Sequence, residues 1–126
     1  MAKIEIKDGS LVIHIQGIDR LFTMRSTLSV PLAHVKGVVA RPEVPELNFM
    51  ESGSNFRGVQ RAGTLCAGTV TMPDGAGYVF CDVHDATRAV AIELEHDAYK
   101  RLIVEVSDET PEITRDRIVA EIRRLR

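Results

Sequence analysis

The stretch that decides the fold runs from Arg88 to Arg126 and reads RAVAIELEHDAYKRLIVEVSDETPEITRDRIVAEIRRLR. Large apolar residues alternate with alanine or glutamate across 89–95, and the same period of two returns across 101–106. Such alternation predicts two strands that each bury one face. The short polar segment 96–100 lies between them, so a hairpin is the simplest connection.

After this hairpin the period of the sequence changes and predicts a helix. Thr110 stands at the N-cap position and Pro111 at the first helical position, and both are favoured there. An apolar stripe follows at helical spacing, made of Ile118, Ile122 and Leu125. Charged residues occupy the other faces, so we expect an amphipathic C-terminal helix that buries this stripe against a sheet.

The rest of the chain indicates further short strands. Asp8-Gly9 between two alternating apolar runs predicts a hairpin over 4–15, and a second hairpin is expected to join 64–72 to 78–82. Shorter strands are expected over 26–30 and 35–40, with one helical turn at 31–34, and segment 20–24 fits either a short helix or a strand. We therefore predict a mainly β (α+β) fold, a single domain over 1–126. It is a strongly bent antiparallel sheet, or a partly open barrel, of about seven or eight strands with one C-terminal helix.

Segment 42–63 is the longest stretch without periodicity, and it contains several large apolar side chains. Those side chains are Leu47, Phe49, Met50 and Phe56. A loop of this length in a small domain is uncommon unless it is functional or mobile. Two interpretations remain open: the apolar residues fold back onto the core, or they form an exposed loop that binds a partner.

The charge balance excludes some classes of function. The chain has 16 basic and 18 acidic residues, mixed along its length, for a net charge of -2. This balance gives no field that would attract nucleic acid or an anionic membrane, so neither is expected as a partner. Residues 1–6 alternate charged and apolar side chains, which is unlike a signal peptide, and no apolar run approaches the roughly 20 residues of a membrane span. A cytoplasmic location is expected.

One cluster has the residue types of metal ligands: Cys66, Cys81 and His84, with Asp82 and Asp85 nearby. Thiolate and imidazole suit zinc, but the spacing matches none of the patterns that identify zinc sites. Two buried core thiols are the competing interpretation. A nucleophilic Cys81 activated by His84 is disfavoured, because alternation along a strand would place the two on opposite faces. We expect no catalytic residue and no cofactor.

The other charged and histidine side chains are expected at the surface. Arg115, Arg117 and the arginines after them are interleaved with acids, and this pattern favours a solvated helix face over a phosphate-binding patch. Asp108 and Glu109 fit a helix entrance, and His34 follows a proline-containing turn.

The order of these elements resembles the pleckstrin-homology-like fold, and more particularly the small bacterial pleckstrin-homology-like domains. The segments that carry the likeness are Leu28 to Val35, Gly63-Thr64, Gly77 to Phe80, the strand pair Ala89 to Leu94 and Leu102 to Val106, and the closing helix. The resemblance implies a binding or assembly module, often oligomeric, without catalytic residues. Related domains that bind phosphoinositides use basic residues around the first hairpin, whereas this turn reads Lys7-Asp8-Gly9-Ser10.

The sequence thus favours a non-enzymatic module that associates with itself or with a protein partner through a sheet edge or a helix. The alternative is a small metal- or ligand-dependent enzyme that uses Cys66, Cys81 and His84. Lipid binding is a third possibility, but it needs a basic concave surface that the sequence does not predict.

Overall fold

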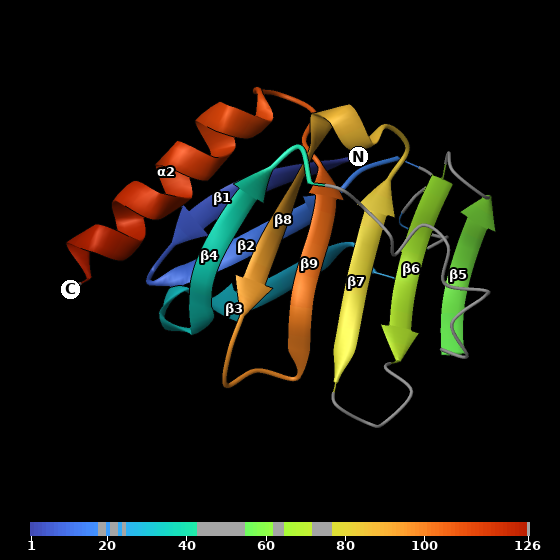
Figure 1. Ribbon diagram of the computed structural model, residues 1–126, viewed down its shortest axis with the longest axis horizontal. Helices are drawn as coiled ribbons and strands as arrows, with labels where there is room; N and C mark the ends of the chain where they lie inside the picture. Colours follow the sequence, from blue (N-terminus) through green and yellow to red (C-terminus); the bar gives the residue numbers. More distant parts are fainter. Residues whose placement is uncertain are drawn as a thin grey trace.

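The computed structural model describes residues 1–17, 20, 23, 25–42, 55–61, 65–71 and 77–125, and at 55–61 and 65 it describes the backbone alone. Within these residues the chain forms nine strands and the C-terminal helix α2 (Pro111–Arg124). No helix among them is long and apolar enough to cross a bilayer. The predicted class is confirmed: a mainly β fold with one C-terminal helix and a sheet arrangement that does not close on itself (Figure 1).

The first three strands form a sheet of their own, in the order β1 (Ala2–Lys7), β2 (Ser10–Ile15), β3 (Thr27–Pro31). The predicted first hairpin is present, with Lys7 opposite Ser10 at its closed end. Asp8 and Gly9 both have positive φ, 52° and 76°. A two-residue turn of this kind requires positive φ at both central positions, and this explains why Asp-Gly is found there.

The remaining strands form a six-stranded sheet. Its strands, in sheet order, are β4 (Val35–Ala40), β8 (Ala89–Leu94), β9 (Tyr99–Glu105), β7 (Tyr78–Val83), β6 (Leu65–Thr71) and β5 (Asn55–Arg61). The hairpins β8–β9 and β6–β7 are antiparallel, as predicted. In contrast to the expected all-antiparallel pairing, β7 and β9 run parallel. The turn η3 (Ala86–Arg88) and β8 together supply the crossover that a parallel pair needs, because β8 lies on the far side of β9.

The predicted irregular segment 42–63 contains strand β5, so the prediction was wrong over 55–61. In β5, Gly58 lies opposite Gly68 of β6 in the ladder. Glycine lowers the β signal of a sequence, and here the pairing with β6 determines the structure. Residues 43–54 lie outside the described residues.

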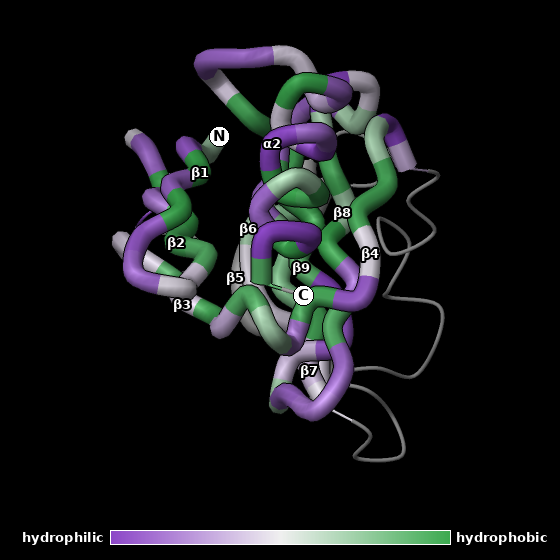
Figure 2. The backbone as a smooth tube through the Cα atoms, turned by 90° about the vertical axis from the view of Figure 1, so that its left-hand side faces the viewer, coloured by the Kyte–Doolittle hydropathy of each residue, from purple (hydrophilic) through white to green (hydrophobic). Residues whose placement is uncertain are grey.

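The two sheets pack face to face, as Figure 2 shows, with apolar side chains between them. Phe80 is the largest fully buried side chain of this core. Val90 and Val104 of the six-stranded sheet belong to the same apolar cluster as Ile118 of α2. The predicted contact between the C-terminal hairpin and the helix is therefore confirmed.

Helix α2 packs mainly against β4 and β8 and begins as predicted (Figure 1). The Thr110 hydroxyl accepts a hydrogen bond from the Ile113 N–H at 3.2 Å, and Pro111 occupies the first turn. Ile118 is fully buried. The expected burial of Leu125 is wrong, because 58% of this residue is exposed beyond the last helical turn.

Arg41 fixes the start of α2 against the six-stranded sheet. Its guanidinium donates to both carboxylate oxygens of Glu112, at 2.7 and 3.1 Å, and also to the Thr87 carbonyl. These hydrogen bonds raise the pKa of Arg41 and lower that of Glu112. The clamp joins the end of β4, the turn η3 and the first turn of α2, and so it sets the position of the helix beside the first sheet.

Candidate functional site: the groove between β1 and α2

Strand β1 is an end strand of the three-stranded sheet, and its backbone shows which groups face outward. In an antiparallel pair, successive residues alternate between bonding the partner strand and pointing away from it. The Met1 carbonyl accepts from Gln16 N–H, on the side of β2, whereas the Ala2 carbonyl accepts from Ser107 N–H, on the opposite side. The even-numbered residues of β1 therefore direct their N–H and C=O groups away from β2.

Two of the three outward carbonyls of β1 are already occupied. The Ala2 carbonyl accepts the Ser107 N–H at 3.1 Å, and the Ile4 carbonyl accepts Nη2 of Arg117 at 2.8 Å. For the Ile4 N–H and for both backbone groups of Ile6, we find no outward partner among the described residues. A short part of the strand edge is thus open to hydrogen bonding.

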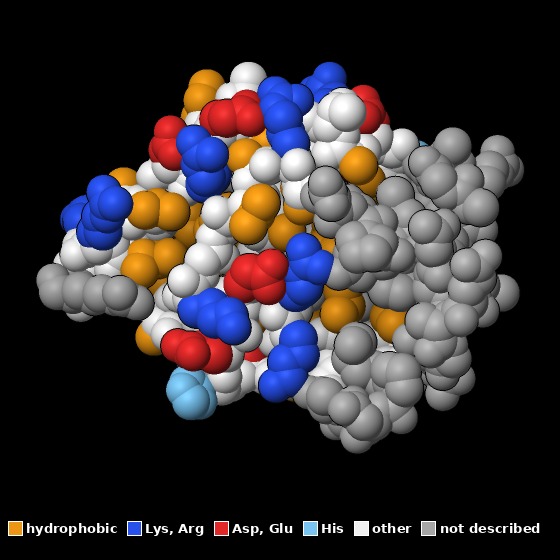
Figure 3. All heavy atoms as spheres, in the orientation of Figure 1, with side chains coloured by type: hydrophobic (Ala, Val, Ile, Leu, Met, Phe, Trp, Pro, Cys, Tyr) orange, Lys and Arg blue, Asp and Glu red, His pale blue; other side chains and the backbone are white. Residues whose placement is uncertain are grey.

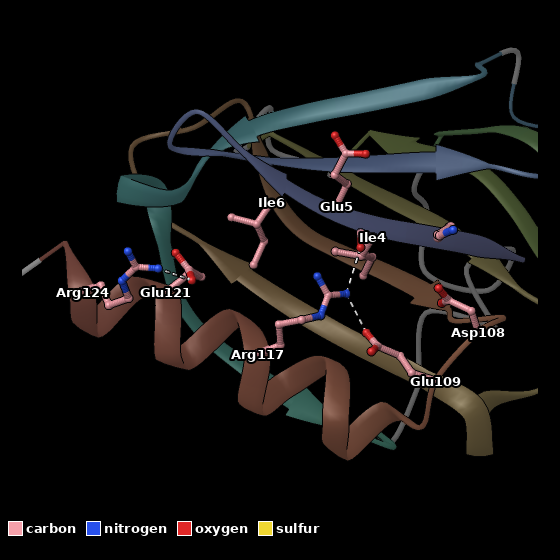
Figure 4. A pocket seen from close by; sticks show the side chains of 9 residues that line it. Ile4, Glu5, Ile6, Asp108, Glu109, Arg117, Glu121 and Arg124 are labelled. Atoms are coloured by element: carbon pink, nitrogen blue, oxygen red, sulfur yellow. Dashed lines mark hydrogen bonds and ion pairs between the residues drawn. The ribbon is translucent and has the colours of Figure 1, made fainter.

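These open groups face a groove of about 580 Å³ between β1 and α2. In Figure 4, Ile4 and Ile6 point toward the helix and Arg117 points from the helix toward β1. Ile4 and Ile6 are the two apolar residues of its lining, and Ile6 is partly buried against the core. The residues that line it are Lys3, Ile4, Glu5, Ile6, Asp108, Glu109, Arg117, Glu121 and Arg124.

Arg117 is held in place by a small network. Its Nη2 donates to Oε1 of Glu109 at 2.6 Å, and the same oxygen accepts the Thr114 hydroxyl at 2.7 Å. Burial raises the pKa of Glu109, but the hydrogen bonds from Arg117 and Thr114 outweigh it, and the net pKa is lowered. Thr114 is fully buried and the side chain of Arg117 is 36% exposed. The guanidinium is thus held at the wall of the groove, a contact that the predicted solvated face did not include.

The charges around the groove are mixed. Arg124 pairs with Glu121 at 2.8 Å, and Glu5 lies 3.6 Å from His14. Figure 3 views the outer face of the six-stranded sheet, and there too basic and acidic side chains are interleaved over the described part. The described residues of the groove therefore contain no cluster of one sign that would bind a phosphate group.

The predicted cysteine cluster is brought together only in part. Cys66 and Cys81 lie on one face of neighbouring strands, both fully buried and both free thiols. A hydrogen bond between them, together with burial, raises the pKa of Cys81 well above its ordinary value. Cys66 is diagonal to Cys81 in the ladder, a separation of about 7–8 Å between Cα atoms that is too long for an unstrained disulfide.

His84 does not join the two thiols. The residue is exposed, and its backbone N–H is bound by Oε1 of Glu105 at 2.7 Å, as is that of Asp85. Among the residues described, no group of three or more His, Cys, Asp or Glu side chains is placed to hold a metal ion. The buried thiols belong to a second apolar cluster with Val79, Val83 and Ile103. This arrangement agrees with the interpretation of both cysteines as core residues.

The predicted partner-binding residues cannot be placed. Leu47, Phe49 and Met50 lie outside the described residues, and for Phe56 only the backbone, in β5, is described.

Two polar contacts were not expected from the sequence. Oδ1 of Asp82 is buried in the core and lies 3.2 Å from the α-ammonium of Met1. Nδ1 of His34 lies 2.8 Å from Oδ2 of Asp97, which joins the turn η1 (Leu32–His34) to the β8–β9 loop. Burial raises the pKa of Asp97, but hydrogen bonds from His34 and from the Tyr99 N–H lower it overall. Neither contact involves a residue that lines the groove between β1 and α2.

We compared the chain with known proteins. No protein-family model, no curated protein and no solved structure matches it. The resemblance to bacterial pleckstrin-homology-like domains therefore stays a prediction, and the function has to be argued from the groove itself.

Sequence reasoning missed the role of Arg117. The one indication of this role is its place on the helix. Arg117 lies three residues after Thr114 and directly before Ile118, and both of these residues are fully buried. A basic side chain next to the buried stripe of a helix can reach the elements against which the helix packs. Here Arg117 reaches the edge of β1. The identity of that edge depends on which strand the helix lies beside, and this could not be read from one sequence.

Proposed function

We propose that this chain is a non-enzymatic binding module that takes up a short extended segment of a protein partner along the edge of β1, in the groove beside α2. The observation that carries the proposal is the open N–H of Ile4 together with the open N–H and C=O of Ile6, which face the groove between β1 and α2. Adding a strand to an exposed edge is a recurrent mode of peptide recognition, in which the backbone supplies affinity and the side chains supply selectivity.

The groove offers no arrangement for covalent chemistry that would favour the enzyme alternative. Four of its charged side chains are engaged in pairs, Glu109 with Arg117 and Glu121 with Arg124. The thiols on which the enzyme alternative depends are buried on the other face of the six-stranded sheet, with a raised pKa at Cys81. We accordingly propose that the module acts by binding alone. The free thiols support a reducing, cytoplasmic location as part of this proposal.

The proposal is tested with random heptapeptides selected against the full chain. The decisive variant is Ile6→Pro, which removes the outward N–H and places a ring in the groove without removing a bond to β2. The matched control is Ile6→Val, which keeps the N–H and most of the apolar contact. We expect selected peptides to bind the control normally and to lose about tenfold or more in affinity for Ile6→Pro, the equivalent of one or two hydrogen bonds.

Amide exchange gives an independent readout. Peptide binding should slow exchange of the Ile4 and Ile6 amides and leave those of Lys3 and Glu5 unchanged. Peptides that bind Ile6→Pro as tightly as the control, or that protect amides elsewhere, would contradict strand addition at β1.

A further inference from the structure

The open edge of β1 is closed at one end by the chain itself. The Ala2 carbonyl accepts both the N–H and the hydroxyl of Ser107, at 3.1 and 3.3 Å, and Ala2 forms a bridge with Val106. An added strand therefore cannot continue past Ile4 toward Ala2. Whatever segment binds here must end, or turn away, opposite Ile4.

The groups still open at that closed end are hydrogen-bond donors. The Ile4 carbonyl is occupied by Arg117, and the Ile4 N–H remains open. Arg117 uses Nη2 for both of its bonds, and we find no partner for its Nε and Nη1 among the described residues. A guanidinium has five N–H donors in a planar fork that matches a carboxylate. Figure 4 places this guanidinium beside Ile4 at the wall of the groove.

The unpaired donors of Ile4 and Arg117 determine whether a bound strand runs parallel or antiparallel to β1. A strand antiparallel to β1 ends here with its C-terminus, whose carboxylate has one oxygen for the Ile4 N–H and one for Arg117. A parallel strand would begin here with an ammonium group beside the guanidinium, where charge repulsion disfavours it. In either direction the bound residue opposite Ile4 leaves the Ile4 carbonyl to Arg117. Glu109 is already engaged by Arg117 and Thr114, and Asp108 is the one exposed acid that opposes a carboxylate at this end.

Resting on the function proposed above, we propose that the bound segment is the C-terminus of a partner chain, with its terminal carboxylate held by Arg117 and the Ile4 N–H. The residue two positions before the terminus then lies opposite Ile6 and exchanges both backbone hydrogen bonds with it. Selectivity comes from the terminal charge and from an apolar side chain that packs on Ile6.

The experiment compares each selected heptapeptide as the free acid and as the C-terminal amide, on the full chain. We expect the amide to bind at least about tenfold more weakly, because it replaces a charge-assisted contact by a neutral one. Arg117→Gln should reduce binding of the acid by a similar factor and remove the difference between acid and amide. Arg117→Lys, which keeps the charge without the fork, should be intermediate, and Asp108→Asn should tighten the acid form a few-fold.

Arg124→Gln is the matched control at the other end of the groove, and it should leave the ratio of acid to amide affinity unchanged. Equal binding of acid and amide by the wild-type chain, with loss in Ile6→Pro, would overturn the terminal-carboxylate assignment and leave the strand-binding function standing. Full affinity of an amide that carries Asp or Glu at its last position would reassign the site to acidic side chains and overturn the proposal. If no peptide of either form binds, both proposals fail.

Discussion

Two proline substitutions at neighbouring positions of β1 test the strand register on which the binding proposal depends. Glu5 lies opposite Val12 and, by the alternation described above, directs its N–H toward β2, whereas Ile6 directs its N–H into the groove. Proline has no N–H and is tolerated only where that group is not needed for the ladder. Glu5→Pro should therefore destabilise the fold much more than Ile6→Pro.

The size of the difference follows from the groups involved. Glu5→Pro loses a ladder hydrogen bond of about 0.5–1.5 kcal/mol. It also leaves the Val12 carbonyl, which faces β1, without its donor, and this costs about 1–3 kcal/mol more. Ile6→Pro loses part of an apolar contact, about 1 kcal/mol, and regains about 0.4–1 kcal/mol because proline restricts the unfolded chain. We expect Glu5→Pro to lower the free energy of unfolding by about 2–4 kcal/mol and Ile6→Pro by about 1 kcal/mol or less.

Urea unfolding of the two variants measures this difference, and amide exchange of the wild-type chain checks its cause. The Lys3, Glu5 and Lys7 amides should exchange slowly, and those of Ile4 and Ile6 should exchange much faster within the same strand. Equal destabilisation by the two prolines, or equal protection of Glu5 and Ile6, would show that the outward direction of the Ile6 backbone is wrong. The groove would then offer no strand edge.

Three further outcomes follow from burial and charge. Ile118→Ala should cost about 2–5 kcal/mol in denaturant unfolding, whereas Leu125→Ala, at a residue 58% exposed, should change stability by less than about 0.5 kcal/mol; similar effects would contradict the helix orientation. Cys66 and Cys81 should resist a thiol reagent such as Ellman's until the protein unfolds, and rapid labelling of the native chain would contradict their burial. The pKa of Glu109 is lower in the folded chain than in the unfolded chain, so the stabilisation from its ion pair is complete above about pH 4.3 and is lost as the pH falls through the folded pKa. Glu109→Gln should therefore make the free energy of unfolding less dependent on pH in the acid range. An unchanged pH dependence would contradict the ion pair.

The parts of the fold that could be predicted are those set by local pattern. The Asp8-Gly9 hairpin, the β8–β9 hairpin and the start of α2 at Thr110 depend on turn chemistry, alternation and capping, and these are properties of neighbouring residues. Strand β5 was missed because Gly58 weakens its pattern and its structure comes from pairing with β6. The parallel β7–β9 pair was missed for a similar reason, since it depends on where a whole hairpin docks.

The candidate site could not be predicted, because it consists of backbone groups left over by pairing and of one side chain that reaches a distant strand. Arg117 contacts a carbonyl 113 residues away in the chain. In the sequence this arginine is one of several in a charged helix, and nothing in its neighbours distinguishes it apart from the buried Thr114 and Ile118. The cysteines attracted attention by residue type, but their surroundings make them part of the core.

The partial closure of β1 limits what can bind to it. An unprotected edge invites pairing with any strand, and proteins commonly block such edges with charges or with their own chain. Here Ser107 occupies the carbonyl of Ala2, Arg117 occupies that of Ile4, and the sharp turn at Asp8 ends the strand on the other side. The open length is therefore too short for a long strand of another folded chain to gain much, while a short segment that ends opposite Ile4 can use every open donor. The same contacts that protect the edge from general aggregation would thus make it selective for a chain end.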